Sequence, residues 1–136
     1  MDHQELMNIL PHRDPMLLLD RAEYREQAAC GEKTITGEEW FLKGHFPGNP
    51  VVPGVILCEI LAQTSCVLPE VGASSQAPVF LTGLEKVRFR RPVGPGDLFR
   101  TRCTLLRAKP PFFWVKGQGF VGDALCVSAE FSFALR

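Results

Sequence analysis

Residues 44–68 read GHFPGNPVVPGVILCEILAQTSCVL, and this stretch decides the fold of the chain. Its first half is rich in proline and glycine, which predicts a stiff, irregular loop. Its second half, from about Gly54 to Leu68, is apolar on nearly every side except at Glu59 and Gln63. A helix that is apolar all round must be covered by other structure. The stretch therefore predicts one central helix around which the rest of the chain is wrapped.

Strand patterns lie on both sides of this helix. Residues 2–10 predict a short helix, and residues 16–24 and 28–36 have the composition of strands. Residues 69–78 predict a flexible connection. Four further strands are expected at residues 79–90, 97–107, 112–121 and 124–135. The turns between them are short, which makes consecutive strands antiparallel.

Length and composition indicate one globular domain over residues 1–136. Hydrophobic residues make up 46% and charged residues 22%, which is ordinary for a globular protein. No apolar run reaches the ~18 residues of a membrane span, and the acidic N-terminus has no signal-peptide pattern. Five scattered cysteines without a Cys-x-x-Cys pair predict free thiols. We expect an α+β protein of the cytoplasm, with an antiparallel sheet curled around one long helix.

Charge is distributed unevenly along the chain. Residues 1–40 hold nine acids and four bases, and residues 81–116 hold two acids and nine bases. This excess is too small to predict nucleic-acid binding, but it suits an acidic partner. Within the basic segment, Lys86, Arg88 and Arg90 alternate with apolar residues, which predicts three cations on one face of a strand. This face, with Arg91, is either a docking surface or simply a solvated face of the sheet.

The helix and the loop before it carry the candidate chemistry. Glu59 lies in apolar surroundings that disfavour its ionised form, which suits a general acid. Gln63 lies one helical turn further, so it is expected to orient the Glu59 carboxyl group. The alternative is a buried glutamate that binds only backbone groups or an arginine. His45 lies in the stiff loop, where a neutral imidazole suits a base; no ligand spacing around it indicates a metal.

Gly54 supplies a third element. Because Pro53 has no N–H, Gly54 offers the first free amide at the helix N-terminus, and glycine lets a substrate oxygen approach closely. The amide is a candidate oxyanion site, although the glycine also serves simply to bring the chain into the helix. A base, an acid and an oxyanion donor suit the dehydration of a 3-hydroxyacyl compound.

Four stretches of the chain resemble the FabZ-type 3-hydroxyacyl-acyl carrier protein dehydratases. They are residues 10–21 (LPHRDPMLLLDR), residues 44–63, residues 84–97 (LEKVRFRRPVGPGD) and the closing strands. The resemblance spans nearly the whole chain and implies the hotdog fold. It implies that His45 is the base, Glu59 the acid, Gly54 the oxyanion donor and Gln63 the residue that positions Glu59.

The resemblance also implies the partners. The substrate is a (3R)-3-hydroxyacyl group on acyl carrier protein, which becomes a trans-2-enoyl group in fatty-acid biosynthesis without any cofactor or metal. The family forms homodimers in which two protomers share each site, and these assemble further into hexamers. Lys86, Arg88, Arg90 and Arg91 are the candidate docking residues for the carrier protein. A hotdog thioesterase, or a dehydratase of a polyketide or aryl-polyene pathway, is the alternative.

Four positions depart from the family pattern. Asp14 stands where an aromatic residue is usual, Cys58 where an aliphatic residue is commoner, and Ile60-Leu61 where Ala-Met is usual. None of them is among the proposed proton-transfer groups. Ile60 and Leu61 bear on the width of an acyl tunnel, so they leave the preferred chain length open.

Overall fold

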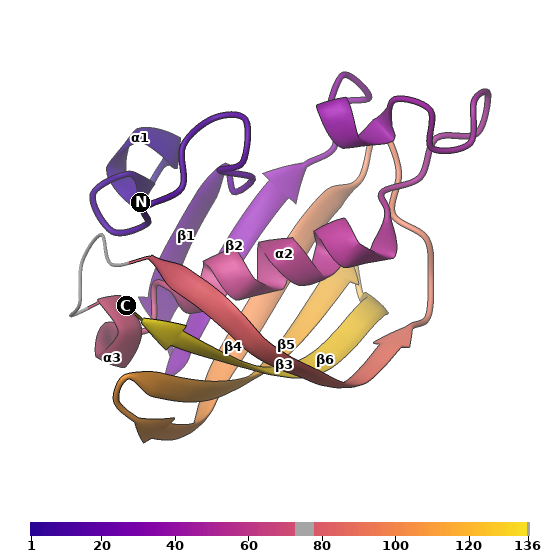
Figure 1. The fold of residues 1–136 in the computed structure, drawn as a ribbon. Helices are drawn as coiled ribbons and strands as arrows, with labels where there is room; N and C mark the ends of the chain where they lie inside the picture. Colours follow the sequence, from indigo (N-terminus) through magenta and orange to yellow (C-terminus); the bar gives the residue numbers. More distant parts are fainter. Residues whose placement is uncertain (73–77, 136) are drawn as a thin grey trace.

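The computed structural model describes residues 1–72 and 78–135 and has a six-stranded antiparallel sheet curled around helix α2 (Gly54–Ser65) (Figure 1). The strands are β1 (Arg21–Arg25), β2 (Ala28–Thr34), β3 (Val79–Phe89), β4 (Leu98–Lys109), β5 (Phe112–Val121) and β6 (Ala124–Leu135). The shorter helices are α1 (His3–Leu6), the 3₁₀ helix η1 (Trp40–Leu42) and α3 (Pro69–Gly72). The predicted α+β class with one central helix is confirmed.

The strand order is β1-β2-β4-β5-β6-β3, so β3 and β4 are not neighbours. Strand β3 pairs with β6, whereas β4 lies between β2 and β5, and all of these pairs are antiparallel as expected. The connection between β3 and β4 instead passes the loop before α2, where the Val52 amide donates to the Val93 carbonyl at 2.8 Å. This bond ties the loop that carries His45 to the end of the sheet.

Helix α2 packs against β2, β4, β5 and β6, and most of its side chains are buried. One contact between the helix and the sheet is at Thr64, whose hydroxyl oxygen lies 2.7 Å from that of Thr101. Gly31 makes room for this pair, because a Cβ there would lie 2.8 Å from the Thr101 hydroxyl oxygen. The absence of a side chain on β2 therefore lets the helix lie close to the sheet.

Only the last part of the strand predicted over residues 16–24 forms a strand, because β1 begins at Arg21. Leu17, Leu18 and Leu19 are buried but pair with no strand in the described chain. Their backbone is held instead by a helix side chain, since Gln63 binds the Leu18 amide and the Met16 carbonyl. Hydrogen bonds from outside the sheet have replaced the expected pairing.

The predicted ends of the helices also need correction. Helix α2 ends at Ser65 rather than near residue 68, because the amides of residues 66–68 bond to carbonyls three residues back and tighten the last turn. The expected helix over residues 2–10 is only α1, whose start is closed by a capping box between Asp2 and Glu5. The predicted connection over residues 69–78 begins with α3, and its residues 73–77 lie outside the described part.

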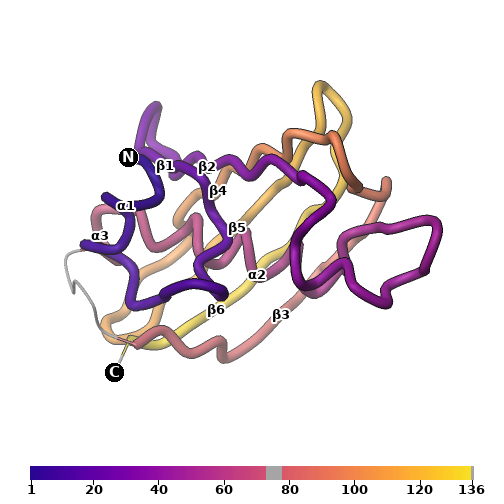
Figure 2. Tube along the Cα trace, turned by 90° about the horizontal axis from the view of Figure 1, so that it is seen from above, coloured from indigo at the N-terminus to yellow at the C-terminus, as the bar shows by residue number. Residues whose placement is uncertain are grey.

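The alternation predicted for Lys86, Arg88 and Arg90 is wrong. The register of β3 against β6 shifts between Glu85 and Arg88, and Lys86 has a φ of +53°. A bulge of this kind breaks the period of two, so the three cations do not share one face. Seen from above, the loop between η1 and α2 projects at the end of the molecule opposite to α1 and α3 (Figure 2).

Candidate active site

His45 is partly buried in the projecting loop, and its ring is held by the backbone. Its Nδ1 lies 2.8 Å from the Val51 carbonyl oxygen. A carbonyl oxygen only accepts, so Nδ1 carries the proton and the Nε2 of the neutral ring keeps its lone pair. The ring of Phe46 lies beside it, with centroids 4.2 Å apart. The loop therefore presents an imidazole whose free nitrogen is a base.

Gly54 begins α2 next to this imidazole. Pro53 is the N-cap, with a φ of −56° and a ψ of 138°, and its carbonyl accepts hydrogen bonds from the amides of Ile56 and Leu57. The amides of Gly54 and Val55 precede these first helical bonds, so they are donors at the positive end of the helix dipole. A backbone N–H at such a helix N-terminus is able to donate to an oxygen on which negative charge develops.

A groove of about 650 Å³ contains both His45 and Gly54. Its other lining residues are Val51, Val52, Pro53, Val55, Leu57, Phe89, Arg90, Arg91 and Pro92. The fold therefore places Arg90 and Arg91 in the same groove as His45. Lys86 is paired with Glu130 at 3.4 Å, and neither Lys86 nor Arg88 lines this groove.

Glu59 lies in a second polar cluster on α2, and it is not among the residues that line the groove. Its side chain is 25% exposed, so it is less enclosed than the apolar sequence around it suggested. Its Oε2 accepts a 2.9 Å hydrogen bond from Gln63, as predicted for residues one turn apart. The structure therefore pairs Glu59 with Gln63 and, within one chain, leaves His45 and Gly54 in a separate group.

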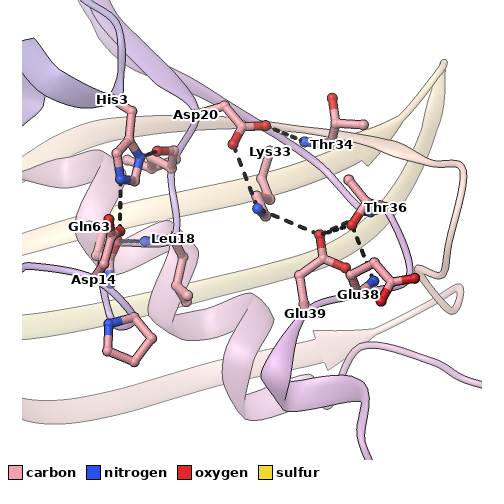
Figure 3. Close-up of polar contacts among 12 residues, drawn as sticks. His3, Asp14, Leu18, Asp20, Lys33, Thr34, Thr36, Glu38, Glu39 and Gln63 are labelled. Atoms are coloured by element: carbon pink, nitrogen blue, oxygen red, sulfur yellow. Dashed lines mark hydrogen bonds and ion pairs between the residues drawn. The ribbon is translucent and has the colours of Figure 1, made fainter.

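Gln63 is fully buried, and its amide group is fully used. Its Oε1 accepts from the Leu18 amide at 2.9 Å (Figure 3). Its Nε2 donates to the Met16 carbonyl at 2.7 Å and also to Glu59. Both N–H groups and the oxygen have partners, which fixes the orientation of the amide. The Glu59 carboxyl group therefore accepts a hydrogen bond from an amide whose orientation is fixed.

The sequence interpretation missed His12. Its Nε2 lies 3.6 Å from Oε2 of Glu59, although 47 residues separate the two in the chain. The only signal was its place within residues 10–21, one of the four stretches that carry the family resemblance. No local spacing connected His12 to the helix.

A larger hollow of about 820 Å³ lies over β1, β2 and β4. It contains none of the predicted site residues. We assign the candidate active site to the smaller groove, because that groove contains the His45 imidazole and the N-terminus of α2.

Comparison with known proteins decides the family. The FabA-like domain family matches residues 10–130. A 3-hydroxyacyl-acyl carrier protein dehydratase FabZ of Caulobacter vibrioides is 44% identical over 137 residues, which cover 96% of this chain and 86% of the relative. The FabZ of Moorella thermoacetica is 41% identical over 141 residues, covering 99% and 96%. The chain belongs to the FabZ family of dehydratases.

Solved structures show the fold of this FabZ-family chain to be a hotdog. The dehydratase heterocomplex ApeI:P from Xenorhabdus doucetiae matches with a TM-score of 0.83 at 19% identity, over 96% of this chain and 90% of that one. The E. coli PaaI protein matches with a TM-score of 0.64 at 12% identity, over 82% and 79%. Within residues 1–72 and 78–135, no helix has the length and apolarity to cross a membrane.

Proposed function

We infer that this FabZ-family chain dehydrates a (3R)-3-hydroxyacyl group on acyl carrier protein to the trans-2-enoyl group in fatty-acid biosynthesis. The observation that carries the proposal is full-length similarity to FabZ dehydratases together with an imidazole whose Nε2 is free to accept a proton. Residues 1–136 are proposed to act as one domain. The cytoplasm is the proposed compartment, in agreement with five free cysteines.

The proposed elimination uses three groups. Nε2 of His45 takes the proton alpha to the thioester carbonyl. The Gly54 amide donates to the carbonyl oxygen as negative charge develops on it. Glu59 gives its proton to the 3-hydroxyl, so the C–O bond breaks and water leaves. His45 has then gained one proton and Glu59 has lost one, and no cofactor or metal takes part in the proposed steps.

The proposal places each active site between two protomers. His45 and Glu59 occupy separate groups within one chain, so a second copy is required to bring the groove to the acid. Strand β3 is the surface proposed for this contact, because it is a long edge strand with exposed apolar side chains. Leu81 and Leu84 are 44% and 49% exposed. An edge of this kind is a template for pairing with another chain; hexamers are the proposed further assembly.

Acidic acyl carrier protein is proposed to dock beside the groove. Arg90 and Arg91 line the groove together with His45. In this proposal the phosphopantetheine arm enters the groove there, next to the two positive charges. Lys86 and Arg88 contribute less, because neither lines the groove and Lys86 is also paired with Glu130. Arg91→Glu should raise KM for the carrier-bound substrate but leave a small thioester mimic unaffected. Equal effects on both substrates would refute docking at this position, and Lys109→Glu is the matched control.

The test of the reaction is incubation with 3-hydroxyacyl-acyl carrier protein. We expect the wild type to form the enoyl product, and His45→Ala and Glu59→Gln to lose most activity. Release of a free acid would indicate a thioesterase instead, and full activity of both variants would refute the mechanism.

Subunit mixing tests the shared site. His45→Ala and Glu59→Gln are each inactive in the proposal, but a mixed dimer joins the intact His45 of one protomer with the intact Glu59 of the other. Co-expressed variants should therefore recover part of the activity. No recovery in dimers shown to be mixed would mean that each site lies within one chain.

A further inference from the structure

His12 is the titratable group that the proposed mechanism does not use, although it lies beside the proposed acid. Its side chain is 20% exposed, and its Nε2 is 3.6 Å from Oε2 of Glu59. Its Nδ1 is buried and has no hydrogen-bond partner in the described part of the chain. A buried ring nitrogen without a partner is unusual and calls for an explanation.

The position of the proton on His12 follows from these contacts. A buried N–H without an acceptor costs more than a nitrogen lone pair without a donor. Nδ1 is therefore the lone-pair nitrogen, and Nε2 carries the proton toward Glu59. Burial lowers the pKa of His12, and the charge of Glu59 opposes this shift only in part. The lowered pKa favours the neutral ring, which is an N–H donor rather than a cation, beside the acid.

Two nitrogen atoms lie near the same carboxyl oxygen. Gln63 Nε2 donates to Oε2 of Glu59 at 2.9 Å, and Nε2 of His12, from a distant segment of the chain, lies 3.6 Å from the same atom. No hydrogen bond or ion pair to Oε1 is found among residues 1–72 and 78–135. When a carboxyl group is protonated, the oxygen that faces N–H donors serves best as the acceptor, and the other oxygen carries the proton. This arrangement favours the acid proton of Glu59 on Oε1.

We propose that His12 is a positioning residue which, with Gln63, holds Oε2 of Glu59 as an acceptor and so places the acid proton on Oε1. The inference rests on the proposed role of Glu59 as the acid. A neutral donor suits this role, because a fixed cation would hold the carboxyl group in its ionised form. The distance of 3.6 Å is longer than a hydrogen bond. Such contacts are often loose without substrate and shorten when it binds.

The test compares variants that keep or lose the N–H near Nε2. His12→Gln places an amide N–H close to that position, whereas His12→Asn places it near Nδ1 and His12→Ala removes it. We expect His12→Ala and His12→Asn to lower kcat on the order of tenfold with KM unchanged, and His12→Gln to keep most of kcat. His3→Gln is the matched control, because it removes a histidine that has no contact with Glu59.

A pH profile separates positioning from a purely structural role. The high-pH limb of kcat reports loss of the acid proton. Loss of a donor to the carboxylate favours its neutral form, so this limb should move to higher pH in His12→Ala and stay in place in His3→Gln. Lower kcat from partial unfolding would leave the limb unchanged, and that result would overturn the proposal.

The outcomes also separate this proposal from the proposed function. A wild type that forms no enoyl product refutes the reaction itself. A wild type that is active, with an inactive Glu59→Gln and fully active His12 variants, refutes only the role of His12. Equal activity of His12→Gln and His12→Asn would refute it as well, since only one of them presents the N–H to Oε2.

Discussion

The ring of Phe89, at the end of β3, lies directly on Gly54, the first residue of α2. A Cβ at residue 54 would be 2.8 Å from Cζ of Phe89 and 2.9 Å from Cε1. The φ of Gly54 is not in the left-handed region, so close approach rather than backbone conformation requires glycine here. The edge strand and the proposed oxyanion donor are thus in direct contact.

Gly54→Ala should therefore displace the Phe89 ring and lower activity. The overpacking is expected to cost about 1–3 kcal/mol of unfolding free energy, measured by urea denaturation. Phe89→Leu in the same chain should recover the stability. If the amide also needs an open approach for the thioester oxygen, kcat should stay low in the double variant. Full recovery of kcat would show that the clash alone explains the loss.

Replacing Gln63 should affect both stability and activity. Gln63→Leu leaves the Leu18 amide and the Met16 carbonyl without their partner. The Leu18 bond is buried, and a buried group left unsatisfied costs about 1–3 kcal/mol. It also removes the donor to Glu59, so kcat should fall. Glu59→Gln is the informative comparison, because it leaves the bonds to residues 16 and 18 in place. Its unfolding midpoint should stay near that of the wild type while its activity is lost.

His3 should make stability fall as the pH rises. Its Nδ1 donates to the Leu19 carbonyl at 2.7 Å, and its Nε2 lies 2.9 Å from Asp14 (Figure 3). The bond to Leu19, with the Asp14 contact, raises the pKa of His3 above 6.5 against the effect of burial. The stabilisation is complete below pH 6.5 and is lost as the pH rises through the folded-state pKa. His3→Gln should flatten thermal unfolding midpoints across this range, and an unchanged slope would contradict the assignment.

Glu39 should make stability fall as the pH decreases, which is the opposite of the effect of His3. Burial raises the pKa of Glu39, but hydrogen bonds from the amides of Thr36 and Gly37 outweigh it, so the pKa lies below 4.5. Its stabilisation is present above pH 4.5 and is lost as the pH falls through the folded-state pKa. Lys33 lies between Glu39 and Asp20, 3.6 Å from each (Figure 3). Glu39→Gln should destabilise the protein at pH 7 and reduce its sensitivity to acid, while exposed Glu38→Gln should change neither.

Local patterns were enough to predict most elements of the fold. The proline before Gly54 and the apolar run after it predicted the start of α2, and the turn residues predicted β3, β5 and β6 within a residue or two. The same stretch predicted the contact between Glu59 and Gln63, because residues one helical turn apart must meet. These features depend on conformational preferences that act over only a few residues.

Contacts between distant segments were decided only by the tertiary structure. The sequence does not show that β3 lies beside β6, or that Gln63 replaces a neighbouring strand for Leu18. Nor does it place His12 next to Glu59. The sequence alone predicted which residues carry the proposed chemistry and determined that one apolar helix must be covered. Packing determined which strand covers it and which side chains meet, because such pairings depend on how surfaces far apart in the chain fit together.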